Sequence, residues 1–111
     1  MSLLNTTDIP GLLKEGEVMR YINILQSHLP EIKRIYKIKY FGIFGSYVKN
    51  LHRDDSDLDI LVEFKEPPSL FKLIELENAL TDLLHVSVDI AIKDDLKPNI
   101  AKHIMGEVIS L

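Results

Sequence analysis

The sequence contains no cysteine and no tryptophan, and it has five glycines and five prolines among 111 residues. Without cysteine the chain can form neither a disulfide framework nor a thiolate metal site, which fits a reducing compartment. No apolar run approaches the roughly 18 residues of a membrane span. The first residues lack the positive flank and long apolar centre of a signal peptide. We therefore expect a cytoplasmic protein with no membrane partner.

An excess of positive charge is also missing. The formal net charge is −4, so the chain has no general basic surface for nucleic acid, and we expect no direct nucleic-acid contact. Hydrophobic residues at 46% and charged residues at 27% are typical of an ordinary globular domain with one core. We expect residues 17–111 to form this domain. We expect residues 1–16 to form an N-terminal arm, because Asp8-Ile9-Pro10-Gly11 has turn chemistry.

The hydrophobic periodicity predicts helices mixed with three short strands. A helix is expected from Glu17, and Pro30 is expected to interrupt it and open a short second helix. Ser69 is expected to cap a third helix, and a last one should follow Pro98 and extend to Val108. Alternating β-branched and aromatic residues predict strands at Ile38–Phe44, Leu58–Phe64 and Val86–Ile92. These elements predict an α/β (α+β) fold, with a small mixed sheet packed by helices.

The second predicted strand carries two acids within an aliphatic run, "DSDLDILV". Because side chains alternate across a strand, Asp57 and Asp59 share one face, and the intervening aliphatic residues point into the core. Asp89 has the same placement in the third predicted strand. If these strands are neighbours, three carboxylates converge on one patch of the sheet. Ionised acids there repel one another and lose hydration, so we expect something to offset that cost.

A hard cation is the simplest compensation. Mg²⁺ favours carboxylate oxygens and is commonly held together with substrate phosphates. Two such ions can activate an attacking oxygen and stabilise a leaving one in phosphoryl or nucleotidyl transfer. The alternative is that these aspartates cap strand ends or face solvent. The Gly45-Ser46 turn favours the metal interpretation, because its backbone can approach a phosphate and its hydroxyl can donate to one. Gly-Ser is nevertheless common turn chemistry.

Together, Gly45-Ser46, Asp57-Leu58-Asp59 and Asp89 resemble the motif set of the DNA polymerase beta-like nucleotidyltransferase superfamily. The chain's short length and the run from Pro67 to Leu111 are still more similar to the minimal nucleotidyltransferases. These are the small partners of HEPN-domain toxins in two-gene toxin–antitoxin modules. The resemblance covers roughly residues 32–111 and implies a nucleotidyltransferase fold.

The resemblance implies an antitoxin that transfers AMP from ATP to a tyrosine of a HEPN-domain RNase toxin, with which it forms a hetero-oligomer. Asp57 and Asp59 would ligate two Mg²⁺ ions, and Asp89 would complete the second metal site and help to activate the acceptor hydroxyl. Gly45, Ser46 and Lys49 would bind the ATP triphosphate. Val48-Lys49-Asn50 departs from the family's frequent Ala-Arg-Gly, and Lys49 lacks the bidentate fork of arginine.

Two other functions stay open at this stage. The protein could neutralise its toxin by binding alone, with an idle nucleotidyltransferase site, and the departure at residues 48–50 allows this. It could also modify a soluble acceptor such as an antibiotic, although the chain is short for a separate acceptor domain. In the loop before the acids, His52 and Arg53 could touch phosphate or a partner, or could be solvated. Tyr47 could stack on a nucleotide base or pack in the ordinary way.

Overall fold

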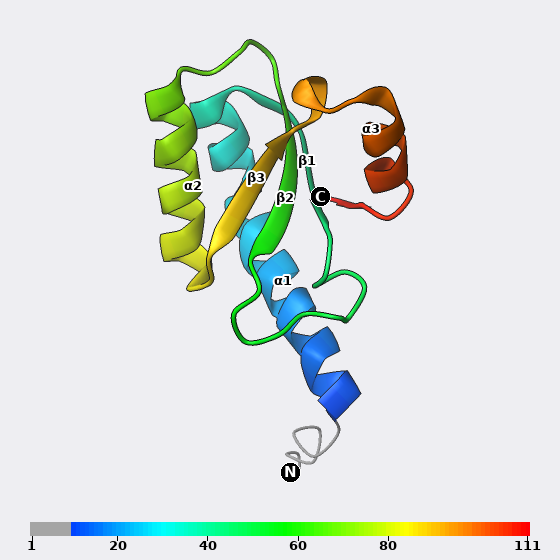
Figure 1. The fold of residues 1–111 in the computed structure, drawn as a ribbon. Coiled ribbons are helices and arrows are strands. Elements are labelled where there is room, and N and C mark those ends of the chain that lie inside the picture. Colours follow the sequence, from blue (N-terminus) through cyan, green and yellow to red (C-terminus); the bar gives the residue numbers. More distant parts are fainter. Residues whose placement is uncertain (1–9) are drawn as a thin grey trace.

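The computed structural model describes residues 10–111, with side chains described from Gly16 onward. It confirms the predicted α/β fold with a small mixed sheet. Figure 1 shows the elements in chain order. They are α1 (Pro10–Tyr36), β1 (Ile38–Phe44), β2 (Leu58–Phe64), α2 (Leu70–Leu84), β3 (Val88–Ile92), the 3-10 turn η2 (Lys93–Asp95), α3 (Pro98–Met105) and β4 (Ile109–Ser110).

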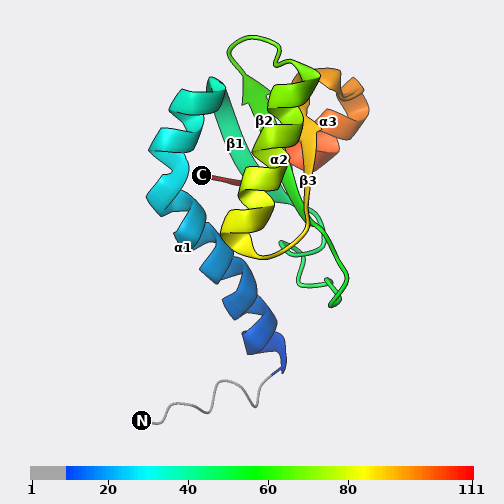
Figure 2. The ribbon, with the colours of Figure 1, turned by 90° about the vertical axis from the view of Figure 1, so that its left-hand side faces the viewer.

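The sheet has the strand order β3-β2-β1-β4. β1 runs antiparallel to β2 and to β4, whereas β2 and β3 are parallel. A parallel pair needs a crossover connection, and α2 supplies it between β2 and β3. α1 and α2 cover one face of the sheet, and α3 lies on the other side (Figures 1 and 2).

The core lies between the sheet and the pair α1 and α2. Leu58, Ile60 and Val62 of β2 are fully buried there, as alternation along the strand predicts. Phe41 and Ile43 of β1 are buried beside them, and α1 and α2 contribute Leu25, Leu76 and Leu80. Each such side chain contributes roughly 1.5–3 kcal/mol by leaving water. This covered face therefore holds β2 in a fixed register.

Both ends of α2 are capped by neighbouring residues. The Ser69 hydroxyl accepts a hydrogen bond from the Lys72 backbone N–H at 3.1 Å, which confirms the predicted N-cap. The helix ends at His85, which adopts a left-handed conformation with φ of 56° and donates its N–H to the Thr81 carbonyl. Both caps satisfy backbone groups that a helix end otherwise leaves unpaired.

Two predictions about α1 are wrong. The helix continues through Pro30 instead of restarting there. Proline removes one backbone donor, but buried Leu25 and Leu29 and partly buried Ile32 keep one apolar stripe packed across the interruption. The helix also begins at Pro10, so the part of the predicted arm from Pro10 to Gly16 is helical. The rest of that arm, residues 1–9, lies outside the described residues.

The C-terminal segment also differs from its prediction. α3 ends at Met105, and Val108 does not belong to it. The chain turns at Gly106 and forms β4, in which Ile109 and Ser110 pair with β1. β3 begins at Val88 rather than Val86. Within residues 10–111, no helix has the length and apolar character needed to cross a membrane.

Candidate active site

The three predicted carboxylates lie on the face opposite the core. The parallel register pairs Asp59 of β2 directly with Asp89 of β3, so both side chains leave the same side of the sheet. Asp57 precedes β2 by one residue and stands two positions before Asp59, which directs it the same way. The sequence left open whether these two strands are neighbours, and the register shows that they are. Asp59 is partly buried, whereas Asp57 and Asp89 are exposed.

Asp59 carries the electrostatic strain of this group. Burial, followed by the negative charges of Asp89, Asp57 and Glu107, raises the pKa of Asp59 to about 6. Both causes disfavour the charged form of the carboxylate. The site therefore has negative charge that the protein itself does not neutralise, and oxygen donors of this kind suit a hard divalent cation.

The three aspartates point to the same side of the sheet but do not form a closed metal-binding site. Across the part of the chain that the structure describes, no three histidine, aspartate or glutamate side chains converge as a metal-binding group. Asp57, Asp59 and Asp89 share one face and one electrostatic field, but they do not surround a common point. Their roles as Mg²⁺ ligands stay predictions.

The Gly45-Ser46 turn lies directly beside Asp59. It follows β1, and Gly45 adopts a φ of +82°, which favours glycine. A Cβ atom on Gly45 would stand 2.1 Å from the Asp59 Oδ2 atom, so no larger residue fits without displacing that carboxylate. The Gly45 carbonyl accepts the N–H groups of Val48 and Lys49 at 3.1 Å each. The chain thus folds back tightly and keeps the turn against the acids.

Glu107 is a member of this site that the sequence analysis missed. Its Oε2 accepts the Gly45 N–H at 3.0 Å, and its Oε1 lies 3.2 Å from the Lys49 ammonium and 3.5 Å from His103 Nε2. Burial alone would raise the pKa of Glu107, but these three donors outweigh it and lower the pKa below its usual value. Glu107 precedes β4 in a segment with no motif, so its position was not readable from residue spacing.

Two loop residues have structural roles. Tyr47 and His52 are 4% and 5% exposed, and their rings stack with centroids 4.0 Å apart. His52 Nε2 lies 3.0 Å from a Glu17 carboxylate oxygen, which ties the loop to α1. The rings of Tyr21 and Tyr47 pack in a T-shaped arrangement with centroids 5.6 Å apart, and burial raises the pKa of Tyr47 to about 12. The interpretations of His52 as solvated or phosphate-binding, and of Tyr47 as base-stacking, are therefore wrong.

Asn50 behaves as its residue type predicts. It stands where the family often has glycine, and it adopts the left-handed conformation with φ of 60°. The residues that precede it keep the turn, with Lys49 exposed and directed to Glu107. The turn at residues 48–50 therefore uses the left-handed conformation that asparagine tolerates.

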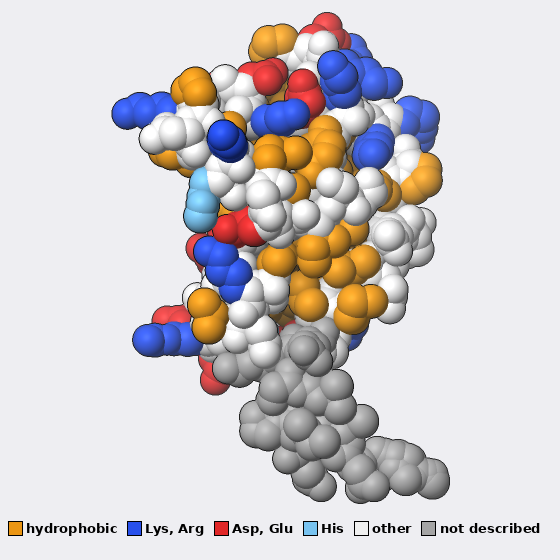
Figure 3. Space-filling view, turned by 90° about the vertical axis from the view of Figure 1, so that its right-hand side faces the viewer, with side chains coloured by type: hydrophobic (Ala, Val, Ile, Leu, Met, Phe, Trp, Pro, Cys, Tyr) orange, Lys and Arg blue, Asp and Glu red, His pale blue; other side chains and the backbone are white. Residues whose placement is uncertain are grey.

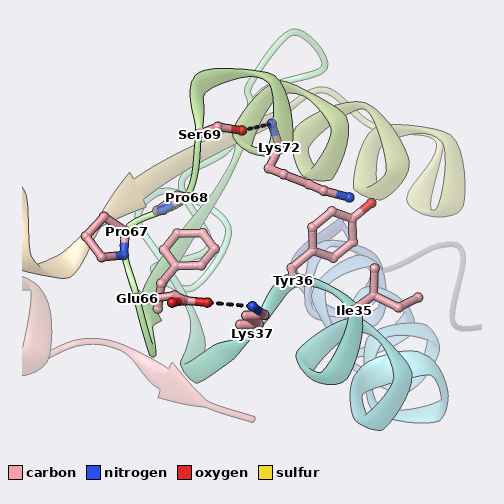
Figure 4. A pocket seen from close by; sticks show the side chains of 9 residues that line it. Ile35, Tyr36, Lys37, Glu66, Pro67, Pro68, Ser69 and Lys72 are labelled. Carbon is pink, nitrogen blue, oxygen red and sulfur yellow. Dashed lines mark hydrogen bonds and ion pairs between the residues drawn. The ribbon is translucent and has the colours of Figure 1, made fainter.

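A cavity of about 190 Å³ lies at the other end of β2. It sits between the end of α1 and the start of α2, and Figure 4 shows Lys37 paired with Glu66 and Lys72 reaching toward Tyr36. Phe64, the last residue of β2, lines it. The acids stand at the opposite end of the strand, so this cavity is separate from them.

Comparisons with known proteins agree with this geometry. Residues 25–111 match the nucleotidyltransferase domain family. The protein adenylyltransferase MntA of Thermococcus cleftensis is 46% identical over 87 residues, which cover 78% of this chain and 88% of that protein. A solved structure provisionally described as a minimal nucleotidyltransferase is 32% identical with a TM-score of 0.68, covering 88% of this chain and 95% of its own.

A more distant structure shares the fold. It belongs to a complex between the tri-AMPylated HEPN toxin of Shewanella oneidensis and its MNT antitoxin. The TM-score is 0.53 at 20% identity, with 90% of this chain and 70% of that chain covered. By family match, identity and shared fold, the chain belongs to the nucleotidyltransferase domain family, among its minimal nucleotidyltransferases, and is a nucleotidyltransferase enzyme.

Proposed function

We propose that this nucleotidyltransferase is a Mg²⁺-dependent protein adenylyltransferase. It transfers AMP from ATP to a tyrosine of a HEPN-domain toxin and so acts as the antitoxin. The observation that carries the proposal is the direct pairing of Asp59 with Asp89 beside the Gly45-Ser46 turn. A relative named as a protein adenylyltransferase, and a shared fold with a complex of an AMPylated toxin, support the acceptor class.

The carboxylates fit Mg²⁺ by their donor chemistry. All three offer oxygen, and the raised pKa of Asp59 reports negative charge that a cation would neutralise. In this proposal Asp57 and Asp59 would hold both ions, and Asp89 would complete the second site. When bound, the ions neutralise charge on the triphosphate and favour ionisation of the acceptor hydroxyl.

The protein's own groups bind and orient the substrates. The Gly45 backbone allows the triphosphate to approach closely, and the Ser46 hydroxyl and the exposed Lys49 ammonium donate to its oxygens. Asp89, exposed on β3, takes the proton of the acceptor hydroxyl. The acceptor oxygen attacks the α-phosphorus, a new oxygen–phosphorus bond forms, and the bond to the pyrophosphate leaving group breaks.

The acceptor has to come from another molecule and reach the open face. Figure 3 shows the side of the molecule that carries α3, where apolar atoms gather centrally and lysine and arginine atoms lie mostly around them. An apolar centre with a charged rim is typical of a protein-binding surface. We propose that the rim of the acid-bearing face, including the loop at residues 47–55, contacts the toxin.

Intact-mass spectrometry tests the proposal. The protein is mixed with the HEPN-domain protein encoded beside it, ATP and Mg²⁺, and the partner should gain whole AMP units. Asp57→Asn should bind the partner but transfer nothing, and removal of Mg²⁺ by a chelator should have the same effect. Asp82→Asn, a change at an exposed aspartate of α2 on the other side of the sheet, is the matched control and should keep full activity.

Neutralisation in cells separates catalysis from binding. If Asp57→Asn protects cells from the toxin as well as the wild type does, masking by contact explains the antitoxin effect. Transfer at the wild-type rate by Asp57→Asn would instead overturn the assignment of this residue to the metal site.

A further inference from the structure

We propose that Glu107 is a positioning residue, which holds the Gly45-Ser46 turn and Lys49 in the arrangement that receives the ATP triphosphate. The inference rests on the proposed function and adds a residue from the C-terminal segment to the site. One carboxylate oxygen accepts the Gly45 N–H at 3.0 Å, and the other lies 3.2 Å from the Lys49 Nζ atom. The two phosphate-facing parts of the loop are thus joined through one side chain.

The burial of Glu107 distinguishes this pair from a surface ion pair. The Glu107 side chain is 17% exposed, whereas the exposed pair Lys72–Glu75 has side chains that are 55% and 54% exposed. A partly buried carboxylate with a charge-assisted hydrogen bond from the backbone holds its geometry more firmly than solvated side chains do. Glu107 therefore has the surroundings to restrain the turn.

Lys49 stays available to a ligand while Glu107 holds it. Its side chain is 46% exposed, so the ammonium faces solvent. An ammonium group has three donors, and the contact with Glu107 uses one of them. The remaining donors can meet phosphate oxygens. Glu107 thus orients Lys49 and leaves its charge accessible, which favours positioning over sequestration.

The alternative is that the Glu107 carboxylate competes with phosphate for the same donors. The two alternatives predict opposite changes in ATP affinity. A positioning residue makes ATP bind more tightly, whereas a competitor makes ATP bind more weakly. Removing the carboxylate should therefore lower ATP affinity under our proposal and raise it if Glu107 is a competitor.

Titration calorimetry with ATP and Mg²⁺ on the full chain, without the toxin, shows whether the substitution raises or lowers ATP affinity. Glu107→Ala should weaken ATP binding on the order of ten-fold, the equivalent of one lost hydrogen bond of about 1.4 kcal/mol. Glu107→Gln should recover part of the affinity, because its amide oxygen can still accept the Gly45 N–H. Hydrogen exchange at the Gly45 amide should be faster in Glu107→Ala and nearer to the wild type in Glu107→Gln.

Glu63→Ala is the matched control. Glu63 is 20% exposed and pairs with two lysines, Lys39 at 3.9 Å and Lys93 at 3.5 Å, near the far end of β2. It should leave ATP affinity unchanged. Unchanged or tighter ATP binding in both Glu107 variants, with a wild type that binds ATP, would overturn the positioning role alone. A wild type that binds no ATP would overturn the proposed function and this inference together.

Discussion

The two faces of β2 are made by alternate residues of one strand, yet their environments are opposite. Toward α1 and α2, Leu58, Ile60 and Val62 have no exposed surface. On the other face, Asp59 is partly buried next to other acids, and burial with their charge raises its pKa to about 6. The covered face therefore stabilises the fold, whereas burial and mutual repulsion of the acids on the other face lower the free energy of unfolding.

The open face is itself divided along its length. Leu61 points the same way as Asp59 but is fully buried, and it lies outside the core cluster beneath α1 and α2. α3 lies on this side of the sheet (Figure 1). The charged site is therefore confined to the end of the sheet near the Gly45-Ser46 turn, and substitutions on the two faces should have separable effects.

The largest effect on stability should come from the covered face. Ile60→Ala removes a fully buried side chain from close packing and should cost about 2–5 kcal/mol in the free energy of unfolding. Urea denaturation measures it. A loss below about 0.5 kcal/mol would mean that the core does not depend on this position, and the contrast between the faces would fail.

A smaller loss in the free energy of unfolding should come from a substitution in the Gly45-Ser46 turn, which lies between the covered face and the charged site. Gly45→Ala places a Cβ atom 2.1 Å from Asp59 Oδ2 on a backbone with φ of +82°. We expect a cost of about 1–3 kcal/mol and strongly reduced nucleotide transfer, because Asp59 must move. Gly16→Ala, where a Cβ would meet nothing within 4 Å, is the control for the change of residue type. Equal melting temperatures and activities in the two variants would contradict the close packing.

The smallest expected effect is a gain, rather than a loss, in the free energy of unfolding. Asp59→Asn should stabilise the Mg²⁺-free protein by about 1–2 kcal/mol at pH 8, after allowance for solvent screening, while abolishing transfer. The folded carboxyl has a pKa of about 6, above an unfolded value of about 3.9. Between these values the folded state binds the extra proton, so this group makes the wild type more stable as pH falls from about 6 to 4.

Chemical denaturation at several pH values measures this dependence. The stabilisation by Asp59→Asn should be largest above pH 7 and should disappear near pH 4. Asp82→Asn, at an exposed aspartate of α2, is the control for the change of residue type. Added Mg²⁺ should stabilise the wild type and not Asp59→Asn. A stabilisation that is independent of pH would show that packing, and not charge, limits this position.

Much of the fold could be predicted because its signals are local. Alternation placed Leu58 and Asp59 on opposite faces, and the Ser69 cap followed from side-chain chemistry next to a helical pattern. Pro30 was misjudged because its local penalty is outweighed by packing on both sides, which no window of sequence displays. β4 was missed because a two-residue strand carries no periodicity.

The sequence by itself determined that Asp57 and Asp59 share a face, that Asp89 has a matching place in its own strand, and that a Gly-Ser turn precedes them. Strand alternation and turn chemistry act within a few residues, so they can be read along the chain. The tertiary structure alone decided that Asp59 meets Asp89, that His52 is buried, and that Glu107 reaches Gly45 from 62 positions away. These contacts depend on strand order and on how the C-terminal segment returns to β1, and long-range packing sets both.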